Sequence, residues 1–372
     1  MKVVITGADG FLGKNLTAHL RERRDIDLVS ITRGSSPSDL RAAVLDGDII
    51  YHFAGVNRSG VASAFDAGNV DLTRRICDEA AASGRRIALV FTSSTQVEHD
   101  TAYGRSKRAA EEVLLRWHET TGFPLWIFRL PNVFGKWSRP NYNSVVATFC
   151  HNIARDLPIR IDDPDAKLTL VYVDDVIRAA VAAIDGSPEG ADGHGPYHTV
   201  APRYSMSVGD LAKAVRAFKA SRESLISPPV GVGLARALYA TYMSYLPPQE
   251  FSYSLPMHED ERGRFVEVLK TVNSGQVSFF TAGPGITRGE HYHHSKSEKF
   301  LVLTGGARFR FRHVVSDETH EITTSGDRPE VVETVPGWAH SITNVSNGEM
   351  VVMLWANETF DAKNPDTYRF RE

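Results

Sequence analysis

The sequence predicts an α/β domain with a doubly wound parallel sheet, followed by a smaller all-β domain. The chain has 372 residues, whereas one domain usually has about 100–200 residues, so two domains are expected. Short aliphatic runs alternate with amphipathic stretches in the first half, as in parallel α/β sheets. After a proline-rich stretch at residues 246–256, short alternating strands indicate an all-β sandwich or barrel. The predicted domains are residues 1–245 and 246–372.

The composition is that of an ordinary globular protein and argues against several classes of partner. Forty-two basic and 45 acidic residues leave a net charge of −3, so electrostatics give no reason to expect nucleic acid or an anionic membrane as a partner. No apolar run approaches the roughly 18 residues that span a bilayer. The first residues show no secretory signal pattern, and Cys77 and Cys150 are too few for a disulfide framework. A cytoplasmic protein is expected.

Five runs of aliphatic and β-branched residues are expected to be buried parallel strands, because they are too short for helices. These runs are residues 3–6, 28–32, 49–54, 87–93 and 125–130. Amphipathic stretches that are expected to form helices lie between them, at residues 12–23, 70–82 and 106–120.

A glycine-rich turn follows the first expected strand. The stretch Thr6-Gly7-Ala8-Asp9-Gly10-Phe11-Leu12-Gly13 has the spacing G-x-x-G-x-x-G and leads into an amphipathic helix. Glycines let the backbone turn tightly and approach a pyrophosphate, and the helix N-terminus offers free N–H groups. Such a turn can also be a turn and nothing more, but its place between a strand and a helix favours dinucleotide binding.

The end of the second expected strand carries a basic residue where an NAD-binding site would carry an acidic one. Thr32 and Arg33 stand there, and Arg33 can pair with the 2′-phosphate of NADP. The alternative is a solvated surface arginine. NADPH is therefore the expected cofactor.

Tyr103 and Lys107 have the spacing Y-x-x-x-K, which places both side chains on one face of a helix. A tyrosine phenol has a pKa near ~10 and needs a neighbouring cation to act as an acid at neutral pH. Lys107 supplies that cation. Ser94 ends the preceding strand and can hydrogen-bond a substrate carbonyl beside the tyrosine.

These motifs together resemble the extended short-chain dehydrogenase/reductase family over roughly residues 1–240. The resemblance also includes Asn69 and the stretches 48–54, 129–135 and 172–176. It implies a Rossmann-type sheet, a nicotinamide cofactor and a nucleotide-linked sugar substrate. The catalytic residues that it implies are Ser94, Tyr103 and Lys107. The cofactor-binding residues that it implies are Gly7, Gly10, Phe11, Leu12, Gly13, Arg33, Ala54, Tyr103 and Lys107.

Two further positions narrow what the resemblance implies. His52 matches a core position of the family, which favours packing over catalysis. Sugar 4,6-dehydratases of the family carry an acidic pair directly after the catalytic hydroxyl residue, whereas this chain has Thr95 and Gln96. The sequence therefore favours hydride transfer without dehydration.

Short strands are expected in the second domain at residues 277–280, 300–303, 307–311 and 350–355. A histidine cluster lies among them. His291 and His293 share one face of a strand, and Glu298 and His340 can join them from neighbouring strands. Three imidazoles and one carboxylate suit zinc, with nickel, iron or manganese as alternatives. The competing interpretation is a histidine-rich strand that serves solubility or packing.

This stretch resembles the cupin superfamily, whose two motifs are both present, although a proline directly precedes Gly337 in the second. It is also similar to dTDP-4-dehydrorhamnose 3,5-epimerases. That similarity implies a catalytic base at His291 and a lysine at Lys299 that supports the developing enolate. Because His291 also belongs to the predicted metal set, the base stays open, with His294 and Glu290 as other candidates.

The pairing of the two domains resembles, over essentially the whole chain, bifunctional enzymes of capsular polysaccharide and lipopolysaccharide biosynthesis. The resemblance implies a UDP-2-acetamido-2,6-dideoxy-4-ketohexose substrate, inverted at C3 by the cupin domain and then reduced at C4 with NADPH. The product would be UDP-N-acetyl-6-deoxy-L-talosamine, on the route to UDP-N-acetyl-L-fucosamine, and the enzyme a homodimer. Two alternatives stay open: a plain 4-ketosugar reductase with a structural cupin, and a non-catalytic sensor of NADP and sugar.

Overall fold

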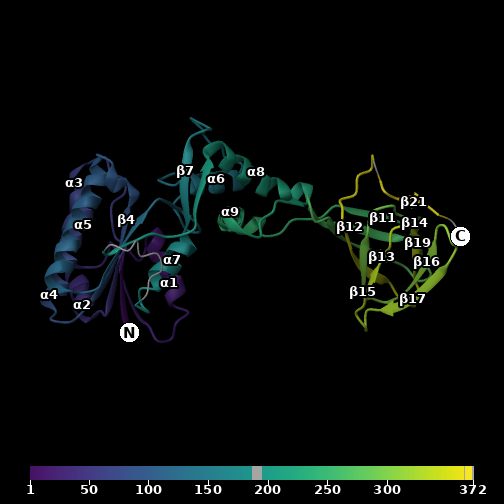
Figure 1. Cartoon of the computed structure of the whole chain (residues 1–372), viewed down its shortest axis with the longest axis horizontal. Helices are drawn as coiled ribbons and strands as arrows, with labels where there is room; N and C mark the ends of the chain where they lie inside the picture. Colours follow the sequence, from purple (N-terminus) through teal and green to yellow (C-terminus); the bar gives the residue numbers. More distant parts are fainter. Residues whose placement is uncertain (187–194, 364, 371–372) are drawn as a thin grey trace. The chain divides into compact units, whose positions relative to one another are not determined.

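The chain folds into two compact units (Figure 1). The computed structural model describes residues 1–186, 195–363 and 365–370. The first unit contains Met1–Val215 and Val232–Pro247, and the second contains Arg216–Gly231 and Pro248–Glu372. Within the described ranges, no helix is both long enough and apolar enough to cross a membrane.

A six-stranded sheet organises the first unit, with the strand order β2-β1-β3-β4-β5-β8 and parallel pairing throughout. Its strands are β1 (Lys2–Thr6), β2 (Asp27–Ile31), β3 (Ile49–His52), β4 (Ala88–Ser94), β5 (Leu125–Leu130) and β8 (Tyr197–His198). The first five correspond to the five predicted strands.

Helices cover both faces of this sheet (Figure 1). Helices α2 (Pro37–Asp46), α4 (Leu72–Ala82) and α5 (Ala102–Thr121) pack side by side on one face, and α1 (Phe11–Leu20) and α7 (Val173–Val181) lie on the other. A short helix α3 (Ser63–Phe65) and a π-helical turn (Asp66–Asp71) lead into α4. The doubly wound α/β class predicted from the sequence is confirmed.

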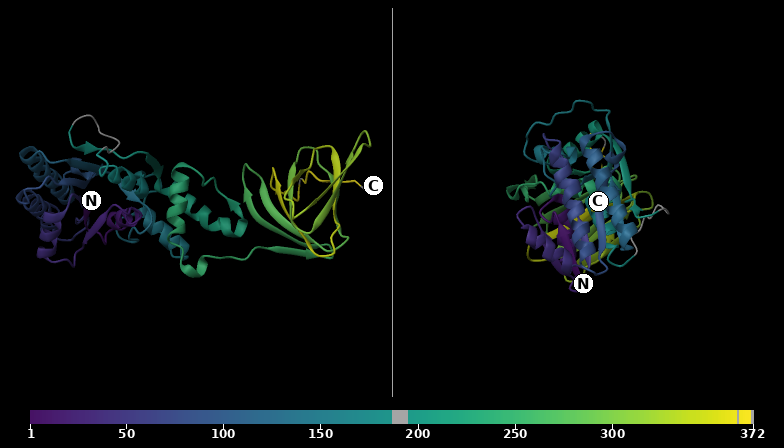
Figure 2. Two further views of the ribbon diagram at one scale, coloured as in Figure 1. Left: turned by 90° about the horizontal axis from the view of Figure 1, so that it is seen from below. Right: turned by 90° about the vertical axis from the view of Figure 1, so that its left-hand side faces the viewer.

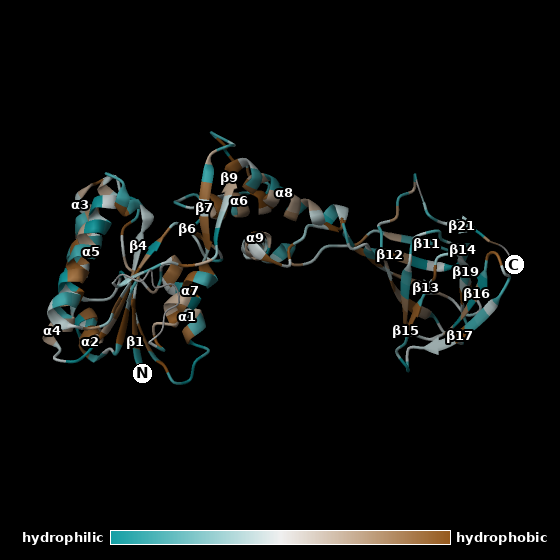
Figure 3. Ribbon diagram, viewed as in Figure 1, coloured by the Kyte–Doolittle hydropathy of each residue, from teal (hydrophilic) through white to brown (hydrophobic). Residues whose placement is uncertain are grey.

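The core of the first unit lies between the sheet and the α2–α4–α5 face. Val4, Ile50, Leu89, Phe91 and Ile127 are fully buried there, and Figure 3 shows hydrophobic residues concentrated on these strands. Because the sheet is covered on both faces, its inner strands β1, β3 and β4 are almost wholly buried and show no alternation. That is why their positions could be predicted from the sequence.

Helix α2 was not predicted, although its start carries a clear local signal. Ser36 Oγ accepts a hydrogen bond from the Asp39 N–H, Asp39 accepts one from the Ser36 N–H, and Pro37 is the first helical residue. This reciprocal capping satisfies two N–H groups that a helix start leaves free. The chain between β2 and β3 is short, but it holds a complete crossover helix.

The remaining elements of the first unit form a three-stranded sheet with neighbouring helices. The strands are β6 (Asn132–Phe134), β7 (Lys167–Tyr172) and β9 (Arg203–Ser207), in the order β6-β7-β9. The helices are α6 (Val145–Ala154), α9 (Gly233–Met243) and the first part of α8 (Val208–Ser224), a helix that passes into the second unit after Val215. Helices α6 and α9 pack against each other.

The second unit consists mainly of two β-sheets (Figure 2). One sheet has the order β10-β12-β13-β20-β15-β18, with β11 paired to β12, and the other has the order β17-β16-β19-β14-β21. The strands are β10 (Ile226–Ser227), β11 (Met257–Asp260), β12 (Gly263–Thr271), β13 (Gln276–Ala282), β14 (Thr287–Tyr292), β15 (Glu298–Thr304), β16 (Gly306–His313), β17 (Thr319–Ser325), β18 (Val331–Glu333), β19 (Trp338–Asn344), β20 (Met350–Ala356) and β21 (Tyr368–Arg369).

Buried side chains from both sheets meet in one core. Phe280, Phe300 and Val352 come from the first sheet, and Phe309 and Ile342 from the second. The rings of Phe300 and Phe309 lie 5.8 Å apart between centroids. This is the all-β barrel that the resemblance to cupins implies, and the predicted all-β class is confirmed.

The two units interleave along the chain, whereas the sequence predicts a single boundary after residue 245. Residues Arg216–Gly231 belong to the second unit, because β10 pairs in parallel with β12 and the Lys270 N–H donates to the Leu225 carbonyl at 2.7 Å. The chain then returns to the first unit for Val232–Pro247, which contains α9.

Candidate functional site

The glycine-rich turn joins β1 to α1 with very little room around its glycines. Gly7 has φ +70°, and a Cβ there would lie 2.7 Å from the Ala54 nitrogen. A Cβ on Gly13 would lie 2.7 Å from the Ala8 Cα and closer still to the Gly7 carbonyl oxygen. A side chain at Gly13 would therefore push α1 away from the turn, and one at Gly7 would push the turn away from the segment that follows β3.

The N-terminus of α1 is open to a ligand. Gly10 caps the helix in an extended conformation and offers no side-chain hydrogen bond, so it satisfies none of the N–H groups of the first turn, which begins with Phe11, Leu12 and Gly13. Those groups and the positive end of the helix dipole suit a pyrophosphate. The predicted set Gly7, Gly10, Phe11, Leu12, Gly13 and Ala54 lies around this turn, and its geometry fits a dinucleotide.

His52 lies beneath this turn in a closed polar network. Its Nδ1 is 2.8 Å from Thr6 Oγ1 and its Nε2 is 2.9 Å from Thr73 Oγ1. Burial, with a smaller effect of the Lys107 charge, lowers the pKa of His52 to about 3. A neutral, fully bonded and fully buried imidazole holds β3 to its neighbours and is not placed for proton transfer to a ligand.

Ser94, Tyr103 and Lys107 come together at the carboxyl end of β4 and the start of α5. Thr101 caps α5 by accepting a hydrogen bond from the Gly104 N–H at 3.0 Å, which fixes the first turn that carries Tyr103. Burial raises the pKa of the Tyr103 phenol, and a hydrogen bond with Ser94 opposes that rise. The phenol is therefore protonated throughout the neutral pH range.

Lys107 is buried and held from several sides. Its Nζ donates to the Thr92 carbonyl at 2.7 Å and lies 4.3 Å from the centroid of the Phe91 ring. Burial lowers the pKa of Lys107 to about 8, and the Glu111 carboxylate, one helical turn later, partly offsets this. At neutral pH the lysine is still largely charged.

Two supporting groups complete the cluster. Asn69 Nδ2 donates to Ser106 Oγ at 2.9 Å and to the Val56 carbonyl at 2.9 Å. Glu111 was missed in the sequence analysis: it is buried, accepts a hydrogen bond from Ser93, and pairs with Arg129 at 2.6 Å. Its signal in the sequence was its position four residues after Lys107, on the same face of the helix.

Arg33 is exposed in the turn that follows β2. The Thr32 N–H donates to Ser35 Oγ at 3.1 Å within that turn. Because β1 and β2 are parallel neighbours, Arg33 lies at the same edge of the sheet as the glycine-rich turn.

The second unit brings His291, His293, Glu298 and His340 together, and we call these four residues the histidine cluster. One ligand atom from each lies within 4.8 Å of the others. His291 and His340 are paired across β14 and β19, and their ring centroids are 4.6 Å apart. Glu298 Oε2 lies 3.2 Å from His293 Nε2 and 3.5 Å from His340 Nε2.

A β-bulge aims His291 into the cluster. The register of β14 against β19 shifts between Gly289 and His291, and Gly289 (φ +97°) and Glu290 (φ +60°) adopt left-handed conformations there. A Cβ on Gly289 would lie 2.8 Å from the His340 carbonyl oxygen. The bulge leaves Glu290 exposed, and His294 is also exposed, whereas His293, Glu298 and His340 are buried.

The electrostatics of the cluster suit a cation. Burial, together with His340 and His293, lowers the pKa of His291 to about 4, which leaves its lone pair free at neutral pH. Although burial favours the protonated form of Glu298, hydrogen bonds with His293 and His340 hold its pKa well below the usual range. Three imidazoles and one carboxylate fit a divalent metal such as zinc.

Lys299 is not where the resemblance predicted it. Neighbouring residues of a strand point to opposite faces, and Glu298 points inward on β15. Lys299 therefore points outward, where it is half-exposed and forms an ion pair with Glu333. The structure brings Lys296 to the cluster instead: it is buried, and its Nζ lies 4.0 Å from Glu298 Oε1. The alternation that starts at Glu298 was the available signal that Lys299 points outward, whereas Lys296 lies before β15 and had no such signal.

Comparison with known proteins agrees with this geometry. The model of the NAD dependent epimerase/dehydratase family matches residues 3–195, and that of the polysaccharide biosynthesis C-terminal domain matches residues 258–368. A UDP-2-acetamido-2,6-beta-L-arabino-hexul-4-ose reductase of Pseudomonas aeruginosa is 56% identical over 368 residues, which cover 99% of this chain and 98% of the relative.

Solved structures show the same two-part architecture. The crystal structure of the capsular polysaccharide assembling protein CapF from Staphylococcus aureus is 41% identical, covers 100% of both chains and has a TM-score of 0.93. A UDP-glucuronic acid 4-epimerase from Bacillus cereus, solved with NAD, covers 66% of this chain at 19% identity and a TM-score of 0.56, and shares the fold alone. The chain belongs to the NAD dependent epimerase/dehydratase family, as a CapF-type member that carries a polysaccharide biosynthesis C-terminal domain.

Proposed function

We propose that the first unit is an NADPH-dependent UDP-sugar 4-ketoreductase. The observation that carries the proposal is the placement of Ser94, Tyr103 and Lys107 together beside the parallel sheet that also bears the glycine-rich turn. A relative that is 56% identical over nearly the whole chain is named as a reductase of a UDP-linked 4-ulose, which supports the substrate class.

Each residue of this site has a role that its surroundings support. A nicotinamide cofactor held at the glycine-rich turn would supply a hydride for C4 of the sugar. The protonated Tyr103 phenol donates a proton to the C4 oxygen, while Ser94 hydrogen-bonds that oxygen and holds it beside the phenol. The Lys107 ammonium stabilises the phenolate that remains and can hold the hydroxyls of the nicotinamide ribose.

Incubation with candidate UDP-4-ketosugars tests this proposal. The absorbance of NADPH falls as the ketone is reduced, and NMR identifies the product. A flat absorbance with every UDP-4-ketosugar would favour the alternative of a metabolite sensor. The intact proton donor at Tyr103 argues against a sensor, because a binding module has no need of one.

Arg33 should give the enzyme a preference for NADPH over NADH. A charge-assisted contact with the 2′-phosphate is stronger than a neutral hydrogen bond, so we expect a preference of roughly tenfold in kcat/KM, or about 1.4 kcal/mol. Arg33→Ala should remove it, whereas Arg74→Ala, which changes an exposed arginine of α4, should not. Equal kcat/KM for both cofactors in the wild type would contradict the assignment.

The reductase should lose activity in alkaline solution. The pKa of Lys107 is lowered to about 8, so its positive charge is present below that pH and is lost as the pH rises through it. Because Tyr103 depends on this charge, kcat/KM should fall above pH 8 with one apparent pKa. A profile that stays flat to pH 10 would show that the charge of Lys107 is not needed.

We further propose that the second unit inverts C3 of the same 4-ketosugar before reduction. In such a step the proton leaves C3, the negative charge moves to the C4 oxygen as an enolate, and a proton returns to the opposite face of C3. The order is fixed by chemistry, because reduction removes the ketone that makes C3 acidic. The substrate would be a UDP-2-acetamido-2,6-dideoxy-4-ketohexose, the product UDP-N-acetyl-6-deoxy-L-talosamine, and the working form a homodimer.

The histidine cluster should hold one divalent metal ion per chain, and zinc is the metal we propose. Elemental analysis of protein purified without chelators should find about one equivalent, and His340→Ala should lose it, while His258→Ala, which changes an exposed histidine of β11, should keep it. Metal removal should lower the unfolding temperature of the second unit, because binding is coupled to folding. Wild-type protein that is purified without metal would contradict the metal site and favour a packing role for the cluster.

A further inference from the structure

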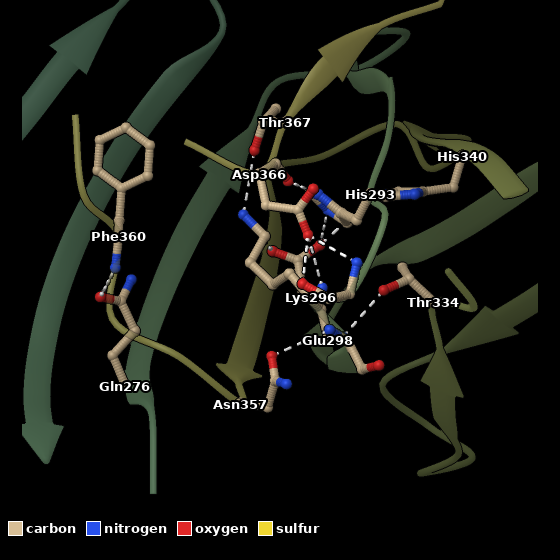
Figure 4. A network of polar contacts seen from close by, with 12 residues as sticks. Gln276, His293, Lys296, Glu298, Thr334, His340, Asn357, Phe360, Asp366 and Thr367 are labelled. Atoms are coloured by element: carbon tan, nitrogen blue, oxygen red, sulfur yellow. Dashed lines mark hydrogen bonds and ion pairs between the residues drawn. The ribbon is translucent and has the colours of Figure 1, made fainter. Parts of the chain in front are cut away.

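We infer that the last described segment of the chain, residues 365–370, is a built part of the metal site, in which Asp366 is a positioning residue for His293 and for the turn that carries it. We call this segment the C-terminal strap. The inference rests on the proposed metal site, and it concerns residues that supply no metal ligand. Figure 4 shows the contacts of Asp366 and Thr367 with the loop beside the histidine cluster.

The first observation is the proton on His293. Its Nδ1 lies within hydrogen-bond distance of the Asp366 carbonyl oxygen. A carbonyl oxygen only accepts, so Nδ1 carries the proton and, in the neutral ring, Nε2 carries the lone pair. That Nε2 faces Glu298 Oε2 at 3.2 Å. The contact with Asp366 therefore fixes the ring of His293 with Nε2 turned toward Glu298 and the rest of the cluster, where it can bind a metal.

The second observation is the Asp366 carboxylate, which orders the turn between β14 and β15. One oxygen accepts from the His294 N–H at 2.9 Å. The other accepts from the N–H groups of Ser295 and Lys296 at 2.7 and 2.8 Å, and from Ser295 Oγ at 2.9 Å. Three successive backbone N–H groups on one carboxylate fix the path of the chain from His293 to Glu298, and therefore the distance between two ligands.

The third observation is how the strap itself is fastened. Strand β21 pairs with β14 at His291 and Tyr292, and the Phe370 N–H donates to the Glu290 carbonyl at 2.9 Å. The rings of Tyr368 and Tyr292 stack with centroids 5.4 Å apart. These contacts hold Asp366 in place independently of its own side chain, and they attach the strap to the bulge that aims His291.

Lys296 connects the C-terminal strap to Glu298, the carboxylate of the histidine cluster. Its Nζ donates to Thr367 Oγ1 at 3.1 Å and lies 4.0 Å from Glu298 Oε1. The oxygen of Glu298 that faces His293 and His340 is the other one, Oε2. Lys296 can therefore hold one carboxylate oxygen while the second binds metal, and Thr367 sets the position of Lys296.

Zinc affinity, measured by competition with a chromophoric chelator, tests the inference in the full chain. We expect Asp366→Ala to weaken Zn²⁺ binding about 10- to 100-fold, the range seen when groups behind metal ligands are removed. Thr367→Val should weaken it several-fold. Glu358→Ala, which removes an exposed carboxylate elsewhere in the C-terminal region, should leave it unchanged. Substitution with Co²⁺ should give an altered visible spectrum in Asp366→Ala alone among these three variants.

A second variant and a wild-type control distinguish loss of folding from loss of Zn²⁺ binding. If Asp366→Ala fails to fold, Asp366→Asn decides, because it keeps the shape of the side chain and one acceptor oxygen. A folded variant, of either kind, that binds Zn²⁺ within twofold of the wild type would overturn the inference while leaving the metal site standing. A wild type that binds no Zn²⁺ would overturn the proposed metal site itself.

Discussion

Tyr103→Phe should slow the reduction of the C4 ketone by ~10²–10⁴-fold, the usual contribution of a positioned general acid. The substitution removes one oxygen and keeps the ring, whose centroid lies 6.1 Å from that of Phe65, so the first turn of α5 should keep its fold. Tyr253→Phe is a matched control, because it removes a hydroxyl from a half-exposed tyrosine of the second unit. Oxidation of NADPH in the presence of a UDP-4-ketosugar gives both rates.

The same variant should leave the second proposed activity intact. The C3 hydrogen of the substrate should still exchange with deuterium from heavy water, because the histidine cluster is untouched. His340→Ala should lose this exchange but should still oxidise NADPH when the substrate is supplied already inverted at C3. Loss of exchange in Tyr103→Phe would show that one site does both reactions. Absence of exchange in the wild type would leave a reductase with a structural second unit.

Gly13→Ala should abolish tight cofactor binding. The added Cβ would lie 2.7 Å from the Ala8 Cα and even closer to the Gly7 carbonyl oxygen, and both are main-chain atoms that cannot rotate away. Overpacking of this kind costs about 1–3 kcal/mol of folding free energy. It also moves the N-terminus of α1 from the position that suits a pyrophosphate. We expect at least a 100-fold weaker affinity for NADPH, or about 2.7 kcal/mol.

Gly34→Ala is the matched control for this experiment. The nearest atom to its added Cβ is Thr32 Oγ1 at 3.8 Å, which is ordinary contact, and the position lies in the turn after β2 at the same edge of the sheet. Titration calorimetry with NADPH measures both variants, and thermal unfolding reports their stability. A Gly13→Ala protein that binds NADPH like the wild type would show that the turn does not hold the cofactor.

The sequence allowed the sheet of the first unit to be predicted because its strands are buried on both faces. Residues 3–5 and 87–91 within these runs are apolar without interruption, which is typical of strands buried on both faces. The glycine-rich turn and the pair Tyr103 and Lys107 were predictable because each is local, with its geometry set by a single helix. Helix α2 was not predicted although Ser36 and Asp39 form a capping box at its start and Pro37 is its first residue.

The second unit shows where such prediction stops. The four cluster residues were predictable from their chemistry and spacing, but Lys299 was placed at the site by family resemblance, whereas the alternation along β15 turns it outward. The role of Asp366 had no local signal. Its carboxylate reaches backbone N–H groups about 70 residues earlier in the chain, and backbone groups carry no side-chain pattern that a sequence could display.

The interleaving of the two units has a consequence for synthesis on the ribosome. The chain passes from one unit to the other at residues 215–216, 231–232 and 247–248. The first unit cannot be completed until Pro247 has left the exit tunnel, and by then β10 has already emerged without its partner β12. A gene cut at any one of these three points would yield two fragments, at least one of which lacks a piece of its own unit or carries a piece of the other.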